Sequence, residues 1–242
     1  MVPEQVAAVA SSPGQAWQFD EFIVHSCNRG LEFAPGDGWG YSNTGYMLLK
    51  RVVEESNGSS FTRAIQQHVT GPLGQVDTAV IEDRASLLGL APGYSRSFSQ
   101  DGRWQDIRAI YDPGWCATGV VASTAADLCE FYHSLFSGKL VYHESLSRMT
   151  ELVRVPGEHP PAVSPSYGLG LMGDPDGAHG PEFGHGGGGP GYDLRAACHP
   201  QFKDRRVTAA VLCNSDEVDA WSALRGVLDA LEPELGDTLR LS

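Results

Sequence analysis

Residues 33–46 read Phe33-Ala34-Pro35-Gly36-Asp37-Gly38-Trp39-Gly40-Tyr41-Ser42-Asn43-Thr44-Gly45-Tyr46. A Pro-Gly turn and a glycine-rich loop lead into Tyr41-Ser42-Asn43, and apolar residues with helical spacing follow as far as Val53. Asn57-Gly58 then supplies a helix stop. The stretch therefore predicts a loop that delivers Tyr41 and Asn43 to the start of an amphipathic helix.

The rest of the chain divides into two patterns. Residues 1–155 read as helices joined by Gly/Pro loops, with Ser60 and Thr124 as expected helix caps. Residues 156–242 read as strands near 167–172, 192–199 and 206–213, followed by a helix that Ser215 is expected to cap. We therefore expect an α+β fold, in which a helical region joins an antiparallel sheet with the C-terminal helix packed on it. Together the two parts are expected to form one incomplete domain.

A sheet of only three strands is thin, and its edges need a partner. The sequence thus predicts an open edge that a second copy of the chain or a complementing chain covers. The formal net charge of −13 and the presence of only three lysines argue against nucleic acid or an anionic membrane as partner. There is no run of about 18 apolar residues, so no membrane span is expected.

Cysteines and histidines do not form a recognisable metal or disulfide pattern. The five cysteines include no C-x-x-C pair, and the eight histidines include no H-x-x-x-H pair or Cys/His quartet. We expect no metal and no cofactor. The aromatic residues either line a substrate cleft or anchor the core: Trp17, Trp39, Tyr94, Trp104, Tyr111 and Trp115.

Four stretches, taken in order, resemble one family. Besides Tyr41-Ser42-Asn43, they are Gly71-Pro72-Leu73-Gly74 before Asp77-Thr78, the run from Thr118 to Leu128, and Phe183-Gly184-His185-Gly186-Gly187. Their order and spacing resemble the serine β-lactamase and penicillin-binding-protein superfamily, especially class C β-lactamases, D-alanyl-D-alanine carboxypeptidases and β-lactamase-like esterases. The resemblance covers nearly the whole chain and implies a β-lactamase/transpeptidase-like fold.

One motif of that family is absent from the sequence. The family's nucleophile is the serine of Ser-x-x-Lys. The residues three before Lys50, Lys139 and Lys203 are Met47, Phe136 and Pro200. The chain is therefore interpreted as an N-terminally truncated member that lacks the first strands and the nucleophile helix.

The resemblance assigns Tyr41 as catalytic base or proton shuttle and Asn43 as a residue that orients the substrate carbonyl. Without the motif lysine, Tyr41 is expected to keep its proton and act as a hydrogen-bond donor. The residues also allow plainer readings, in which Tyr41 is a packed loop tyrosine and Asn43 is the helix N-cap. Ser42 is a poor substitute nucleophile because no base is supplied to it.

The resemblance also assigns His185, Gly186, Gly187 and Gly188 to substrate binding. His185 would contact a substrate carboxylate or polarise the site, and the N–H of Gly188 would be an oxyanion donor. The plainer reading is a flexible glycine-rich loop, and a phosphate-binding loop is disfavoured because no Lys-Ser/Thr follows.

The function that the resemblance implies is hydrolysis of a small-molecule ester, β-lactam or D-peptide through an acyl-serine. Because the nucleophile motif is absent, the chain alone is expected to be inactive. The alternative is a non-catalytic module that binds a ligand or peptide, or half of a complemented enzyme.

Overall fold

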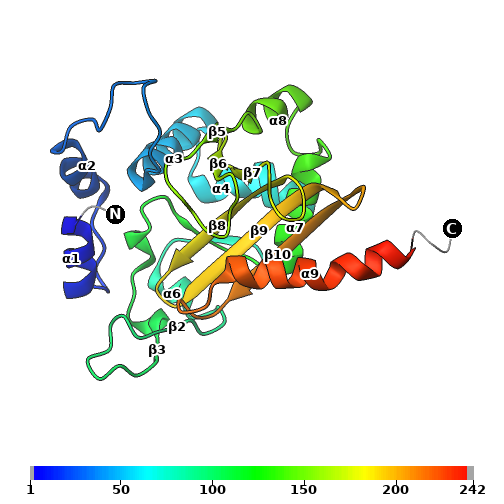
Figure 1. Cartoon of the computed structure of the whole chain (residues 1–242). Coiled ribbons are helices and arrows are strands. Elements are labelled where there is room, and N and C mark those ends of the chain that lie inside the picture. The colour runs from blue at the N-terminus through cyan, green and yellow to red at the C-terminus, as the bar shows by residue number, and fades with distance from the viewer. Residues whose placement is uncertain (1–2, 239–242) are drawn as a thin grey trace. The chain divides into compact units, whose positions relative to one another are not determined.

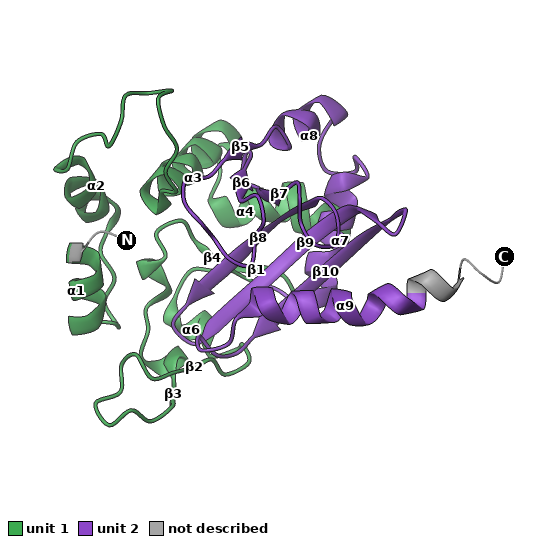
Figure 2. Ribbon diagram, viewed as in Figure 1, with its two compact units in different colours: residues 1–122 green, residues 123–242 purple. Residues whose placement is uncertain are grey.

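The computed structural model describes residues 3–238, which fall into two compact units divided between Ala122 and Ser123 (Figure 2). The division lies ahead of the boundary at residue 155 that the sequence suggested. The physical reason is that the helix after Thr124 packs on the sheet, and its buried residues Tyr132 and Leu135 belong to the same core as Cys198. This helix therefore belongs with the strands.

Unit 1 holds short helices and two small sheets. Its first sheet pairs β1 (Ala79–Ile81) with β4 (Val120–Ala122), and its second pairs β2 (Tyr94–Ser95) with β3 (Gln105–Asp106), both antiparallel. Three 3₁₀ or π segments are η1 (Gln66–Thr70), η2 (Ile107–Ala109) and η3 (Pro113–Trp115). The α-helices are α1 (Pro3–Ser11), α2 (Phe19–Cys27), α3 (Asn43–Asn57), α4 (Phe61–Ile65), α5 (Gly71–Leu73) and α6 (Arg84–Leu87).

An aromatic cluster connects α2 to the turn at η3. The ring of Trp17 lies 5.4 Å from that of Phe22 and 5.6 Å from that of Trp115. The indole N–H of buried Trp115 also donates to the carbonyl of Pro13 at 3.0 Å. Trp115 therefore anchors the core rather than lining a substrate cleft.

Helix α3 was expected from the sequence, but most of its apolar face is not covered. Ser42 caps its start and Gly58 ends it in the left-handed conformation, at a φ of 62°. Met47 is the buried residue of the helix, whereas Leu49 and Val52 are each 55% exposed. Spacing predicts the helix correctly because it follows from local geometry, whereas burial depends on which surfaces surround it.

Unit 2 is built on a six-stranded antiparallel sheet in the order β10-β9-β8-β7-β6-β5 (Figure 1). The three expected strands are present, but the stretch 167–172 is a hairpin of two strands rather than one, and further strands extend the sheet. The strands are β5 (Val153–Arg154), β6 (Ser166–Tyr167), β7 (Met172–Asp174), β8 (Glu182–Gly189), β9 (Tyr192–Phe202) and β10 (Arg205–Cys213).

The helices of unit 2 are α7 (Ala125–Phe136), α8 (His143–Met149) and α9 (Ala220–Thr238). Neighbouring residues of β9 point to opposite faces of the sheet. Ala196 therefore packs in the hydrophobic core between the sheet and α7, and Ala197 packs in the core between the sheet and α9. Burial of each α9 leucine, Leu224 and Leu228, contributes about 1.5–3 kcal/mol. The sheet is thus covered by a helix on each face, one more than the sequence suggested.

The turns explain how these strands reverse direction. Lys203 and Asp204 both have positive φ, at 46° and 62°, as a two-residue type I′ hairpin requires between β9 and β10.

The cap of α9 is not Ser215, as expected from the sequence, but Asp219, whose carboxylate accepts from the N–H groups of Trp221 and Ser222. The helix therefore starts later than predicted, because Asp219 is nearer to the apolar run and accepts from the N–H groups of its second and third residues.

None of the described helices is long and apolar enough to cross a bilayer. All five cysteines are free thiols.

Candidate active site

The predicted site residues fall into two groups, one in each unit. Tyr41 and Asn43 stand at the start of α3 in unit 1, and His185, Gly186, Gly187 and Gly188 lie on β8 in unit 2. The two groups are therefore described separately.

Ser42 sets the start of α3. Its backbone is extended, and its hydroxyl oxygen accepts a hydrogen bond from the backbone nitrogen of Gly45 at 3.0 Å. Ser42 is therefore the N-cap of the helix. Asn43 is the first residue inside the helix, so the plainer reading of Asn43 as the N-cap is wrong. Local sequence could not separate the two because serine and asparagine cap about equally well. Ser42 is thus engaged in holding the helix, and the side chain of Asn43 is not needed for that task.

Tyr41 lies just before this cap. Its ring centroid is 5.8 Å from that of Tyr46, and the side chain is about half exposed. Partial burial, and secondarily the nearby Tyr46, raise the pKa of the Tyr41 phenol. The phenol therefore keeps its proton at neutral pH.

Strand β8 is paired along only part of one side. It pairs with β9 from Phe183 to Gly189, but with β7 only from Glu182 to Gly184. Among the strands that the structure describes, none pairs with residues 186–189 on the side away from β9. The glycine-rich segment is therefore a strand and not a flexible loop, and part of it has a partner strand on the β9 side only.

Packing explains only one of the glycines in this strand. A methyl group on Gly184 would overlap the backbone of Ala196 on β9. A methyl group on Gly186 or Gly187 would meet its nearest atoms at 3.4 and 3.5 Å, which is ordinary contact, and one on Gly189 would meet open space. A methyl group on Gly188 would meet Asp193 Oδ1 at 3.2 Å, which is a tight contact. The contacts within unit 2 therefore do not require glycine at positions 186, 187 and 189, and bare backbone at this edge is suited to close approach by a ligand.

His185 uses both ring nitrogens within unit 2. Its Nδ1 lies 2.6 Å from the carbonyl oxygen of Gly186, and its Nε2 lies 3.0 Å from the hydroxyl of Tyr167. Burial lowers the pKa of His185, the hydrogen bond with the Gly186 carbonyl opposes this shift, and the charge of Arg195 adds to it. The imidazole is therefore neutral at pH 7. Sequence reasoning did not single out Tyr167, because it lies in what was expected to be one plain strand.

A buried ion pair lies next to the glycine segment. Arg195 of β9 faces Glu182 of β8 through its Nε at 3.1 Å and its Nη2, and both side chains are buried. The guanidinium also lies over the ring of Trp221 on α9, at 4.0 Å. The positive charge of Arg195 is thus paired with groups of unit 2.

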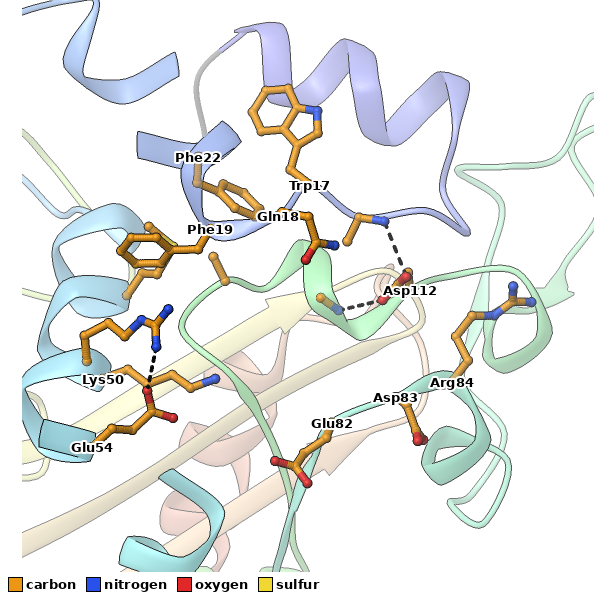
Figure 3. Close-up of a pocket in the computed structure, with 15 residues that line it drawn as sticks. Trp17, Gln18, Phe19, Phe22, Lys50, Glu54, Glu82, Asp83, Arg84 and Asp112 are labelled. Carbon is orange, nitrogen blue, oxygen red and sulfur yellow. Dashed lines mark hydrogen bonds and ion pairs between the residues drawn. The ribbon is translucent and has the colours of Figure 1, made fainter. Parts of the chain in front are cut away.

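Unit 1 also contains a cavity of about 630 Å³ between α2, α3 and the segment that carries Asp112 (Figure 3). Its polar side chains mainly support the local fold: Asp112 accepts from the N–H groups of Ala16 and Gly114, and Asp83 caps α6. Tyr41 and Asn43 are not among the residues that line it. No cluster of three His, Cys, Asp or Glu side chains suited to a metal occurs within residues 3–238.

Comparison with known proteins decides the family. A family model described as "Beta-lactamase" matches residues 9–232. The chain belongs to the β-lactamase family. This β-lactamase-family chain thereby falls in the serine β-lactamase and penicillin-binding-protein superfamily, as its motifs suggested, and its α+β fold is of the β-lactamase/transpeptidase type.

Individual relatives agree with this assignment. Penicillin-binding protein 4* of Bacillus subtilis (strain 168) is 28% identical over 201 residues, which cover 78% of this chain and 43% of that protein. The structure of a D-stereospecific amidohydrolase from Streptomyces sp. matches with a TM-score of 0.71 and 27% identity, covering 88% of this chain and 60% of that one. The β-lactamase-family chain therefore spans less than two thirds of the length of each of these relatives.

An octameric penicillin-binding protein homologue from Pyrococcus abyssi matches with a TM-score of 0.76 and 24% identity, covering 96% of this chain and 52% of that one. At this identity the match supports the fold alone.

Proposed function

We propose that this chain forms the ligand-binding walls of an acyl-transfer site that takes a small ester, β-lactam or D-peptide. The observation that carries the proposal is the glycine segment of β8. Among the described strands, residues 186–189 pair with β9 on one side and with no strand on the other, and packing requires no glycine at Gly186 or Gly187. An extended acyl chain can therefore lie along this edge as an added strand.

In this proposal the two groups of site residues have separate roles. Tyr41, as a protonated phenol, donates to the leaving group or to the substrate carbonyl, and Asn43 orients the carbonyl. The N–H of Gly188 is one oxyanion donor. Hydrolysis itself requires a serine whose Oγ attacks the carbonyl, expels the amine or alcohol with a proton, and leaves an ester that water then cleaves.

That serine is not supplied by a Ser-x-x-Lys motif in this sequence, and Ser42 is held as a helix cap. The proposed function of the chain by itself is therefore binding without turnover. D-stereospecific amidohydrolase activity, named for the Streptomyces structure, is a property of that protein and supports only the choice of D-amino-acid amides among the probes.

The test is a binding and turnover assay on purified chain with three probes: nitrocefin, p-nitrophenyl butyrate and a D-amino-acid amide. We expect at least one probe to bind without being hydrolysed, and Gly187→Ala to weaken its binding at least tenfold. The matched control is Gly226→Ala on α9, where an added methyl meets nothing within 4 Å.

Two results would contradict the proposal. Binding that is unchanged by Gly187→Ala would place the ligand elsewhere. Turnover above the buffer rate that disappears in Tyr41→Phe would show that the chain has a nucleophile of its own.

A second role, in which another chain completes the sheet, is favoured by one observation. β10 is an edge strand that pairs only with β9 among the described strands, and its nine residues contain no proline. We propose that a second copy or a complementing chain pairs along β10. Light scattering should then show a mass that rises with protein concentration and falls in Leu212→Lys, because a charge disfavours edge pairing. A monomer at all concentrations would exclude pairing between copies.

A further inference from the structure

The loop that leads into α3 folds back on itself. The N–H of Asp37 donates to the carbonyl of Ala34 at 3.0 Å, and Gly36 between them has a φ of 93°. Pro35 precedes Gly36, which fits a type II turn, in which proline takes the second position and glycine, with its positive φ, the third. The turn reverses the chain directly after Phe33, so the residues that follow the turn return to the Phe33 side chain.

The ring of Phe33 lies against the backbone of two glycines beyond the turn. A methyl group on Gly38 would lie 2.7–3.0 Å from three ring atoms of Phe33, which is too close for carbon atoms. A methyl group on Gly40 would lie 3.7 Å from the same ring, which is ordinary contact. Neither glycine has a positive φ, so the ring itself, and not the backbone conformation, excludes a side chain at Gly38. Phe33 is only 39% exposed because part of its surface rests on these glycines.

Tyr41 stands between this contact and the cap of α3. On one side, Gly40 lies next to the Phe33 ring. On the other side, Ser42 is the N-cap of α3, and its carbonyl accepts from the N–H of Tyr46 at 3.1 Å. The chain is therefore held on both sides of Tyr41, and the Tyr41 ring lies 5.8 Å from that of Tyr46. Side chains supported in this way by packed neighbours keep one orientation.

We propose that Phe33 is a positioning residue, and that its ring, seated on Gly38, fixes the loop so that Tyr41 is oriented before a ligand arrives. The consequence for a ligand rests on the proposed function of Tyr41, whereas the orientation of Tyr41 does not. A phenol that is oriented in advance binds more tightly, because its rotamer does not have to be fixed on binding.

The orientation of Tyr41 is tested without ligand, by NMR of the aromatic side chains. In the unmodified chain we expect a nuclear Overhauser effect between the rings of Tyr41 and Tyr46. Phe33→Ala and Gly38→Ala should both abolish it, because the first removes the Phe33 ring and the second displaces it. The pKa of the Tyr41 phenol, which partial burial raises, should fall toward its ordinary value of 10 in the same two variants.

Two control variants keep the contact. Gly40→Ala adds the same methyl group two residues later, where its nearest atom lies at 3.5 Å, and Phe33→Tyr keeps the ring. Both should retain the Overhauser effect and the raised pKa of Tyr41. Far-UV circular dichroism shows which variants fold, and Gly38→Ala decides alone if Phe33→Ala does not. A Tyr41 that is unchanged in a folded Phe33→Ala or Gly38→Ala variant, or that is equally disturbed in Gly40→Ala, overturns the proposal.

The consequence for a ligand is tested with nitrocefin, p-nitrophenyl butyrate and a D-amino-acid amide. Phe33→Ala should weaken the binding of a probe by about two- to tenfold, the value of one hydrogen bond, and Tyr41→Phe should do the same. Phe33→Ala should add nothing in the Tyr41→Phe background, because both changes act through one phenol. Two effects that add overturn the route through Tyr41. If no probe binds, the proposed function fails, and the Overhauser experiment decides the role of Phe33 by itself.

Discussion

Replacing His199 with leucine is expected to flatten the dependence of stability on pH. His199 of β9 is only 1% exposed, and neither of its ring nitrogens has a hydrogen-bond partner among the described residues. Burial lowers its pKa, while the charge of Glu182 opposes that shift, and His179 and Arg195 add to it. The folded chain therefore buries a neutral imidazole that would cost free energy to protonate.

The free energy of unfolding falls at low pH because protons bind preferentially to the unfolded chain. Because the folded-state pKa of His199 lies below its ordinary value of 6.5, the unfolded chain takes up the proton first as the pH falls. The contribution of His199 to the free energy of unfolding is fully present above its ordinary pKa of 6.5. As the pH falls below that value this contribution is lost, until the folded chain is protonated as well. Each such group contributes up to about 1.4 kcal/mol per pH unit. His185 is shifted in the same direction, so the unmodified chain has two contributions and His199→Leu keeps one.

Leucine should not destabilise the chain at pH 8. Two unpaired nitrogens are removed, each of which costs about 1–3 kcal/mol when buried. The ring contact with Phe202, at 6.3 Å between centroids, is lost and costs about 0.5–1.5 kcal/mol. The free energy of unfolding at pH 8 is therefore expected to stay equal or to rise.

The assay is urea denaturation followed by far-UV circular dichroism from pH 5.5 to 8 at constant ionic strength. Carboxyl groups whose pKa the fold lowers, such as that of Glu130, change charge below this window. The control is His143→Leu, the same change at an exposed histidine of α8, which should keep the slope of the unmodified chain. An unchanged slope in His199→Leu, or a loss of more than about 2 kcal/mol at pH 8, would refute this reasoning, because the nitrogens would then have partners.

Two further changes test local features. Gly184→Ala should lower the free energy of unfolding by at least about 3 kcal/mol or prevent folding, because its methyl overlaps the backbone of β9. Gly189→Ala in the same strand should be tolerated, because its methyl meets open space. Thermal denaturation distinguishes the two variants, and equal melting temperatures would contradict the packing. Ser42→Ala should cost about 1 kcal/mol through loss of the α3 cap, and Ser42→Asp should restore it; urea titration measures both, and a stability unaffected by alanine would show that the cap is not needed.

The sequence by itself determined the family, the fold class and the principal strands and helices. These follow from local rules: the spacing of apolar residues predicts α3 and α7, and Thr124 caps α7 as expected by accepting the N–H of Asp127. The motif residues Tyr41 and His185 were also found by pattern, because each belongs to a short continuous stretch. The absence of Ser-x-x-Lys is equally a property of the sequence given.

The tertiary structure decided what depends on residues far apart in the chain. It paired Tyr167 with His185 across 18 positions and Arg195 with Glu182 across 13. Among the described strands, it gave residues 186–189 of β8 a partner on the β9 side only. It also assigned the cap of α3 to Ser42 and the cap of α9 to Asp219. Local patterns do not encode these outcomes, because a side chain's charge, tautomer and exposure are set by the neighbours that folding brings to it.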